Sequence, residues 1–263
     1  MALCKTDAII LHSRKQGETS KILSMYTLEF GKLSVMAKGS RGIRSKHTGA
    51  LETFSHVSII FYYKQERGLQ YLSQVSLLSR FPSLFTELGK LSLASIPCEI
   101  IARTEDEGHP NPELYSLLLH TLQAIDQAGK ASKQIIRAFK LKFLSISGFE
   151  PEFHCLQCGK AELEPVNRFS VSQGGYCCSS CPPPDEPVSV LNRHAMQLLS
   201  WFLKVPIEQT SQAVCSKDTA EQMDSFLHDL LCYHIDTLCQ LKSEQYLKQL
   251  ENGLGKKGDF KNQ

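Results

Sequence analysis

The chain has 263 residues, of which 42% are hydrophobic and 21% charged, so it can bury a sizeable core and is long enough for about two domains. No apolar run approaches the roughly 18 residues of a transmembrane helix, which argues against a membrane-spanning protein. The N-terminal residues lack the long apolar core and small-residue cleavage site of a signal peptide, so a cytoplasmic protein is expected.

The charge is divided unevenly along the chain. Residues 1–80 carry 12 Lys and Arg against 5 Asp and Glu, a net charge of +7. The remaining residues carry 17 against 22, a net charge of −5. A basic part is therefore joined to an acidic part, and the basic part predicts a polyanionic partner.

Five short segments in the first 80 residues have the β-branched residues, alternation and flanking turn signals of strands. They are residues 6–13, 19–27, 32–37, 54–63 and 70–78. Five strands without a long helix predict a small closed barrel of the OB type, and an SH3-like barrel is the alternative.

The segment between the third and fourth of these strands concentrates positive charge. Its cations are Lys38, Arg41, Arg44 and Lys46, among glycines and serines that let a phosphate chain approach the backbone. Further cations lie around the first turn, at Arg14, Lys15 and Lys21, and rings lie nearby at Phe61, Tyr62, Tyr63 and Tyr71. Cations that follow a backbone, with rings that stack on bases, are what a single-stranded nucleic acid requires. The alternative is a solvated basic loop with aromatic residues in the core.

From Phe81 onward the apolar residues recur at helical spacing. The first apolar stripe runs to Ile101, and Pro97 is expected to kink or break it. The next helix is predicted to begin with Asn111 as its N-cap and Pro112 at its first position.

A third helix is predicted over residues 131–147. Its outer face holds Lys133, Arg137 and Lys140, which form either a second phosphate contact or a solvated face. Helices resume at Leu191, and Asp218 is the predicted cap of a long final helix. Residues 252–263 are polar and rich in Gly and Lys, so a disordered tail is expected.

Two C-x-x-C motifs, with 19 residues between them, interrupt the helical pattern. The spacing predicts a four-cysteine zinc site whose ligands are Cys155, Cys158, Cys178 and Cys181. His154 or Cys177 could replace the neighbouring ligand in a different register. Disulfides are the other alternative, but the five remaining cysteines are scattered, as expected of reduced thiols. Four protein ligands fill the coordination sphere, so the zinc would be structural.

The predicted organisation is an α+β multidomain protein. An OB-fold nucleic-acid-binding domain covers residues 1–80, and a helical domain covers residues 81–150 and 188–251. A zinc-binding insertion at residues 151–187 interrupts the helical domain, and residues 252–263 form the tail.

This order of parts resembles the RecO family of bacterial recombination mediators. The resemblance covers the chain to about residue 250, and no single motif is as specific as the ordered set. The matching segments are residues 17–23, 27–33, 37–41 with Ser45, 139–144, 148–151, and Gly174 with Gly175 before the second C-x-x-C motif.

The resemblance implies a non-enzymatic role in DNA repair and homologous recombination, in the bacterial cytoplasm and associated with the nucleoid. Such proteins bind single- and double-stranded DNA and anneal complementary strands. They act with RecR to load RecA onto DNA coated by the single-stranded-DNA-binding protein. By position, the implied DNA contacts are Lys38, Arg41, Arg44, Lys46, Arg14 and Lys21. Some members lack the cysteines, which implies that zinc stabilises the fold.

Other functions fit parts of the pattern. An RNA-binding protein of ribosome assembly or translation could combine the same barrel and zinc module. A zinc hydrolase is disfavoured because four thiolates leave no open coordination position. A scaffolding protein would match the acidic helical part alone.

Overall fold

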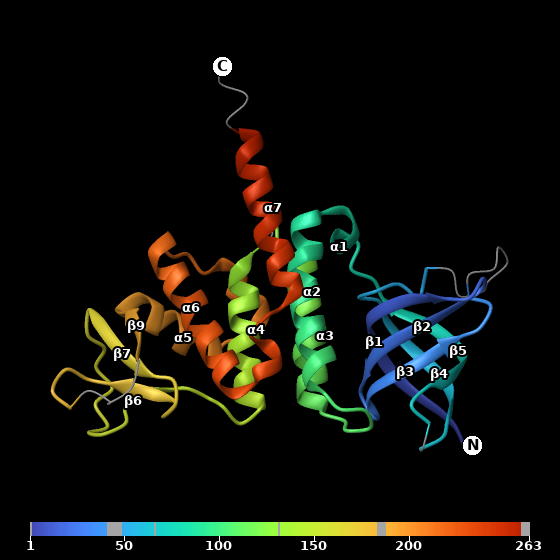
Figure 1. Ribbon diagram of the computed structural model, residues 1–263, viewed down its shortest axis with the longest axis horizontal. Helices are drawn as coiled ribbons and strands as arrows, with labels where there is room; N and C mark the ends of the chain where they lie inside the picture. Colours follow the sequence, from blue (N-terminus) through green and yellow to red (C-terminus); the bar gives the residue numbers. More distant parts are fainter. Residues whose placement is uncertain (1, 41–48, 66, 131, 183–187, 259–263) are drawn as a thin grey trace. The chain divides into compact units, whose positions relative to one another are not determined.

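The computed structural model describes residues 2–40, 49–65, 67–130, 132–182 and 188–258, and for residues 253–258 it describes the backbone alone (Figure 1). The chain forms two compact units. One comprises Met1–Gln127 with Leu241–Gln263, and the other comprises Ala128–Gln240. Within the described residues, no helix is both long and apolar enough to cross a membrane.

Five strands of the first unit close into a barrel. They are β1 (Ala2–Gln16), β2 (Ser20–Thr27), β3 (Gly31–Ala37), β4 (His56–Tyr63) and β5 (Gln70–Ser79). Their order is β1-β2-β3-β5-β4, with β4 pairing back onto β1 and with β3 and β5 running parallel. This closed five-stranded arrangement confirms the predicted OB-type barrel.

Alternation along the strands fills the barrel interior. In β3 the side chains of Leu33, Val35 and Ala37 are buried, while those between them are partly exposed. The same period of two puts Phe61 inside and Tyr62 outside on β4. The apolar core therefore fixes which side chains the barrel presents outward.

Helices complete the first unit. They are α1 (Ser83–Thr86), α2 (Leu88–Thr104), α3 (Pro112–Gln127) and α7 (Lys242–Gly258). The Asn111 side chain accepts a hydrogen bond from the backbone N–H of Leu114 at 3.0 Å, so Asn111 caps α3 as predicted. Pro97 lies inside α2, which continues past it. Helix α7 extends to Gly258, whereas a disordered tail was expected from residue 252.

The second unit combines helices with a small sheet (Figure 1). Its helices are α4 (Lys133–Ile146), η1 (Ile207–Gln212), η2 (Asp236–Leu238), α5 (Arg193–Lys204) and α6 (Lys217–His234). Its sheet has the order β6-β8-β7-β9, from β6 (Glu152–Cys155), β7 (Val166–Ser170), β8 (Gly175–Cys177) and β9 (Val188–Asn192). The cysteine-bearing sheet therefore continues to Asn192, beyond the expected end at residue 187. Helix α6 is capped by Ser216, whose side chain accepts from the N–H of Thr219, and not by the predicted Asp218.

Of the three cations on the predicted outer face of α4, Lys133 is exposed but the other two are not solvated. Arg137 and Lys140 are buried, with exposed fractions of 6% and 7%. The guanidinium group of Arg137 donates to both carboxylate oxygens of Asp224 on α6, at 2.8 and 2.7 Å. The prediction of a solvated face fails for Arg137 and Lys140, because α5, α6 and η1 all pack against α4.

Candidate nucleic-acid interface and metal site

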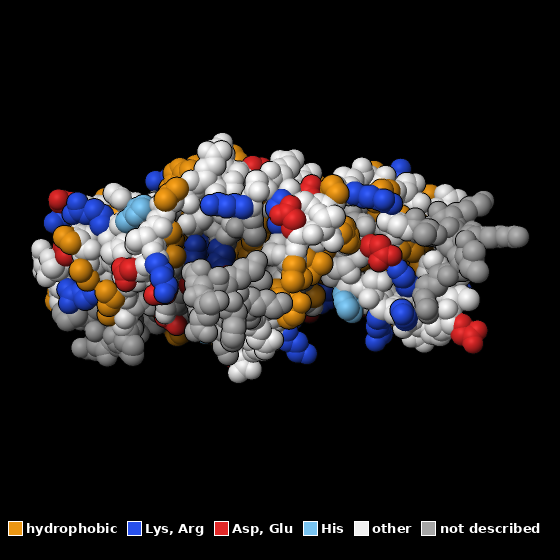
Figure 2. All heavy atoms as spheres, turned by 90° about the horizontal axis from the view of Figure 1, so that it is seen from above, with side chains coloured by type: hydrophobic (Ala, Val, Ile, Leu, Met, Phe, Trp, Pro, Cys, Tyr) orange, Lys and Arg blue, Asp and Glu red, His pale blue; other side chains and the backbone are white. Residues whose placement is uncertain are grey.

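Several cations lie at or just beyond the ends of the barrel strands. Lys15 near the end of β1 pairs with Lys21 near the start of β2, and Lys21 pairs with Ala37 at the end of β3. Lys38 follows directly, and Arg67 lies in the connection between β4 and β5. We call the exposed residues Arg14, Lys15, Lys38 and Arg67 the basic mouth. Lys and Arg side chains are visible on the barrel surface in Figure 2.

Tyr71 is the ring that two cations of the basic mouth contact. The Lys38 Nζ atom lies 4.6 Å from the centroid of its ring, and the Arg67 guanidinium carbon lies 4.9 Å from it. Both distances are within the range of a cation–π interaction. Two cations from separate connections therefore meet over one aromatic side chain.

A buried amide fixes the connection that carries Arg67. Gln70 is 3% exposed, and its side chain donates to the carbonyl oxygens of Lys64 and Arg67 at 3.0 and 2.5 Å. It also accepts a hydrogen bond from the N–H of Lys64 at 3.0 Å. The sequence prediction missed Arg67 as a contact because it lies nearly 30 residues from Lys38; its place in a turn beside Tyr71 was the available signal.

Lys21 differs from the other predicted contacts. Its ammonium group bonds to the Glu52 carboxylate at 2.9 Å and to the carbonyl oxygen of Leu51 at 3.2 Å, and its side chain is 17% exposed. Lys21 thus ties the start of β2 to the residues before β4. The predicted contacts Arg41, Arg44 and Lys46 lie outside the described residues.

The four predicted rings have different environments. Phe61 is fully buried, and Tyr63 packs against Phe30 and Phe61 at centroid distances of 5.2 and 6.1 Å. Tyr62 is 41% exposed, and Tyr71 is partly exposed. Tyr63 is partly exposed as well but packs against the barrel core, whereas Tyr62 and Tyr71 lie outside that core.

The second unit brings the four predicted cysteines together. One potential ligand atom from each of Cys155, Cys158, Cys178 and Cys181 lies within 4.8 Å of the others. The Sγ atoms of Cys155 and Cys181 are 3.8 Å apart, and those of Cys158 and Cys178 are 3.7 Å apart. Gly159, with φ of 71°, closes the first turn, and its N–H bonds to the carbonyl oxygen of Cys155 at 2.8 Å. This cluster can hold a metal ion.

Backbone N–H groups favour a thiolate in this cluster. Burial raises the pKa of Cys155, but N–H groups of Cys178, Cys158 and Gln157 outweigh burial and lower the pKa to about 6. Hydrogen bonds with Cys178 and Cys158 raise the pKa of Cys181. The protein therefore stabilises the thiolate form of Cys155, and the thiolate is the form that binds a metal.

The two alternative ligands have other partners. Cys177 is buried, and its thiol donates to the carbonyl oxygen of Pro182 at 3.3 Å. His154 is half-exposed and pairs with Glu152 at 3.3 Å. Neither belongs to the group of four that the structure assembles among its described residues.

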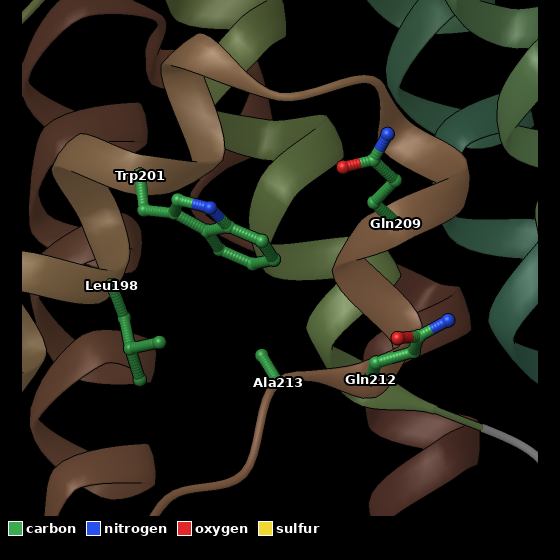
Figure 3. A pocket seen from close by; sticks show the side chains of 5 residues that line it. All are labelled: Leu198, Trp201, Gln209, Gln212 and Ala213. Atoms are coloured by element: carbon green, nitrogen blue, oxygen red, sulfur yellow. The ribbon is translucent and has the colours of Figure 1, made fainter.

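A pocket of about 480 Å³ lies elsewhere in the second unit (Figure 3). Leu198 and Trp201 on α5 line it, with Gln209 and Gln212 on η1 and Ala213 beyond it. The lining side chains that the structure describes are all uncharged, so they offer no cation to a phosphate and no charged ligand to a metal.

Comparison with known proteins gives a consistent match across the chain. Residues 1–81 match the family described as Recombination protein O N terminal, and residues 86–245 match Recombination protein O C terminal. The DNA repair protein RecO of Thermoanaerobacter sp. (strain X514) is 28% identical over 253 residues, covering 96% of this chain and 100% of that protein. The protein of the same name from Roseiflexus sp. (strain RS-1) is 31% identical over 228 residues, covering 86% and 79%. The one from Desulfatibacillum aliphaticivorans is 30% identical over 251 residues, covering 93% and 96%.

Proposed function

This chain belongs to the recombination protein O family, and from that premise we propose that it is a DNA repair and recombination protein that binds DNA through the basic mouth. The observation that carries the proposal is the meeting of Lys38 and Arg67 over Tyr71 at the end of an OB-type barrel. OB folds bind single strands with cations along the backbone and rings beneath the bases.

The mechanism that we propose is non-enzymatic. Cations of the basic mouth neutralise phosphates and release counterions, so binding weakens steeply as salt rises. We propose Arg41, Arg44 and Lys46, which lie outside the described residues, as further phosphate contacts. A strand held by its backbone leaves base edges free to pair, which allows the protein to anneal complementary strands.

We further propose the partners that the family resemblance implies. The protein binds single- and double-stranded DNA and, with RecR, loads RecA onto DNA coated by the single-stranded-DNA-binding protein. Family membership supports this proposal, and the basic mouth supplies the DNA-binding part of it.

Zinc is the proposed ion of the cysteine cluster. A tetrahedral ion with Zn–S bonds of about 2.3 Å has ligand sulfurs about 3.8 Å apart. The sulfur pairs Cys155–Cys181 and Cys158–Cys178, at 3.8 and 3.7 Å, fit that geometry. Four thiolates would leave no open position, so bound zinc would supply folding stability. Cys155, Cys158, Cys178 and Cys181 would hold it.

Binding of a fluorescent single-stranded oligonucleotide, with RNA of the same sequence as competitor, tests the proposed function. We expect tight, salt-sensitive binding to DNA and faster duplex formation after the complementary strand is added. Lys38→Ala should weaken binding, whereas Lys217→Ala, which removes an equal charge from a largely exposed site on α6, should not. Preferential RNA binding would instead favour a role in ribosome assembly or translation. Absence of binding at low salt would contradict the proposal.

A further inference from the structure

A second pocket of the second unit, of about 550 Å³, is lined by α6 and by the small sheet, which pack together through β9. Residues 171–172 after β7 and residues 188–189 at the start of β9 line it from the sheet, and Asp229, Cys232 and Tyr233 line it from α6. The two strand segments lie side by side because Ser170 pairs with Val188. The volume is within the range of sites that hold small organic molecules. We call this cavity the thiol pocket.

One carboxylate gives the thiol pocket its charge. Asp229 is the only charged side chain among the described residues that line it. The Ser189 hydroxyl donates a hydrogen bond to Asp229 at 3.2 Å, which ties the carboxylate to β9. The ring of Tyr233, which is 57% exposed, adds a face that attracts cations. The pocket therefore favours a ligand with a positive group over a neutral or negative one.

Cys232 gives the thiol pocket a nucleophile. Its Sγ atom lies 3.6 Å from Nε2 and 3.8 Å from Nδ1 of His228, one helical turn earlier on α6. An imidazole beside a thiol takes up the thiol proton and stabilises the thiolate, which is the form that attacks a disulfide. Cys232 is partly exposed, so a small disulfide in the pocket can reach its sulfur.

We propose that the thiol pocket binds small disulfides that carry an ammonium group, and that Cys232 forms a mixed disulfide with them there. The ammonium group pairs with Asp229 while the sulfur of Cys232 attacks one sulfur of the ligand. A new S–S bond forms as the ligand's own S–S bond breaks, and the released thiolate takes the proton that His228 removed from Cys232. The ligand is the oxidant, because its released half leaves as a thiol while Cys232 is oxidised.

The other cysteines of the second unit have different environments. Four of them form the metal cluster, and Cys177 is buried. Cys215 accepts a hydrogen bond from the Gln134 amide at 3.1 Å. Cys239 is partly exposed, as Cys232 is, but it does not line the thiol pocket. Cys239 is therefore a matched control within the same protein.

The test measures the rate of mixed-disulfide formation at each cysteine of the full-length protein, by mass spectrometry with peptide mapping. Cystamine carries ammonium groups, hydroxyethyl disulfide is neutral and dithiodiglycolate carries carboxylates. Each rate is divided by the rate of an unstructured cysteine peptide, which corrects for the intrinsic reactivity of the disulfide. We expect Cys232 to react fastest with cystamine and slowest with dithiodiglycolate, and to react faster with cystamine than Cys239 does. Equal corrected rates at the two cysteines, or equal corrected rates of the three disulfides at Cys232, would overturn the proposal.

Two variants separate the roles of the carboxylate and the imidazole. Asp229→Asn should lower the corrected rate of cystamine at Cys232 by about 2- to 5-fold, the effect of losing a surface ion pair, without slowing hydroxyethyl disulfide. His228→Gln should slow all three disulfides at Cys232, because less thiolate forms. Cys239 should keep its wild-type rates in both variants, which shows that the fold is intact. If Asp229→Asn left the preference for cystamine unchanged, the proposed recognition of the ammonium group would be wrong.

Discussion

Lys21 lies at the edge of the basic mouth with its charge already neutralised by Glu52. We therefore expect Lys21→Ala to lower the salt slope of DNA binding less than Lys38→Ala does. It should lower the melting temperature more, because it frees the Leu51 carbonyl and the Glu52 carboxylate. Salt titrations and thermal melts of the two variants, side by side, measure both effects. An equal loss of slope would assign Lys21 a direct phosphate contact.

Arg137 is a buried cation whose bidentate partner, Asp224, is partly exposed. Asp224→Ala leaves the guanidinium group buried with its hydrogen bond to Gln134 but without a counter-charge. Hydrogen bonds to charged groups contribute about 1.5–3 kcal/mol, so a loss of that size is expected in the free energy of unfolding. Urea denaturation measures it, with Glu221→Ala as a control on the same helix. If the free energy of unfolding of Asp224→Ala matched that of the wild type within experimental error, water would be replacing the Asp224 carboxylate as the partner of Arg137.

At the level of elements, α7 depends on a carboxylate from α2. Glu99 accepts hydrogen bonds from the N–H groups of Lys242 and Ser243, at 3.0 and 2.8 Å, and from the Ser243 hydroxyl. Burial raises the pKa of Glu99, but these hydrogen bonds and Arg103 outweigh burial and hold the pKa below its ordinary value. The ionised carboxylate therefore acts as a cap for α7.

The sign of the pH dependence follows from that lowered pKa. Because the pKa of Glu99 is lower in the folded state, the folded state binds fewer protons there than the unfolded state. The contribution of ionised Glu99 to folding stability is therefore fully present above the ordinary glutamate pKa, and it is lost as the pH falls through the pKa of Glu99 in the folded state. Glu99→Gln should cost about 1 kcal/mol at neutral pH. Thermal melts should show a smaller loss of stability for this variant than for the wild type between neutral and acidic pH. If the melting temperatures of Glu99→Gln and the wild type fell in parallel as the pH was lowered, the capping role of Glu99 would be contradicted.

Elements were predictable where one physical signal dominates. Strand alternation predicted the barrel, and Asn111 before Pro112 predicted the start of α3, because both signals are local. The environment of Arg137 was not predictable, since it depends on which helices pack around α4. The capping of α6 by Ser216 was missed because Asp218, two residues later, has the same chemistry. Arg67 was missed because only the closed barrel brings it beside Lys38.

At the scale of the whole molecule, the two candidate sites lie in different units. The cysteine cluster belongs to Ala128–Gln240, and the basic mouth belongs to the unit that contains the barrel. Cys155→Ser should therefore release the metal and lower the melting temperature of the second unit, while DNA affinity stays unchanged. Metal content, calorimetry and DNA titration of the same preparation measure this. Stoichiometric zinc in the variant would refute the ligand assignment.

The measurement that tests the central claim most directly is the salt slope of single-strand binding for the wild type, Lys38→Ala and Arg67→Ala, with Lys217→Ala as the control. Each barrel variant should lower the slope by about 0.7, the value of one lost phosphate contact, and the control should leave it unchanged. If both barrel variants kept the wild-type affinity and slope, the DNA would bind elsewhere, and the basic mouth would not be the nucleic-acid interface.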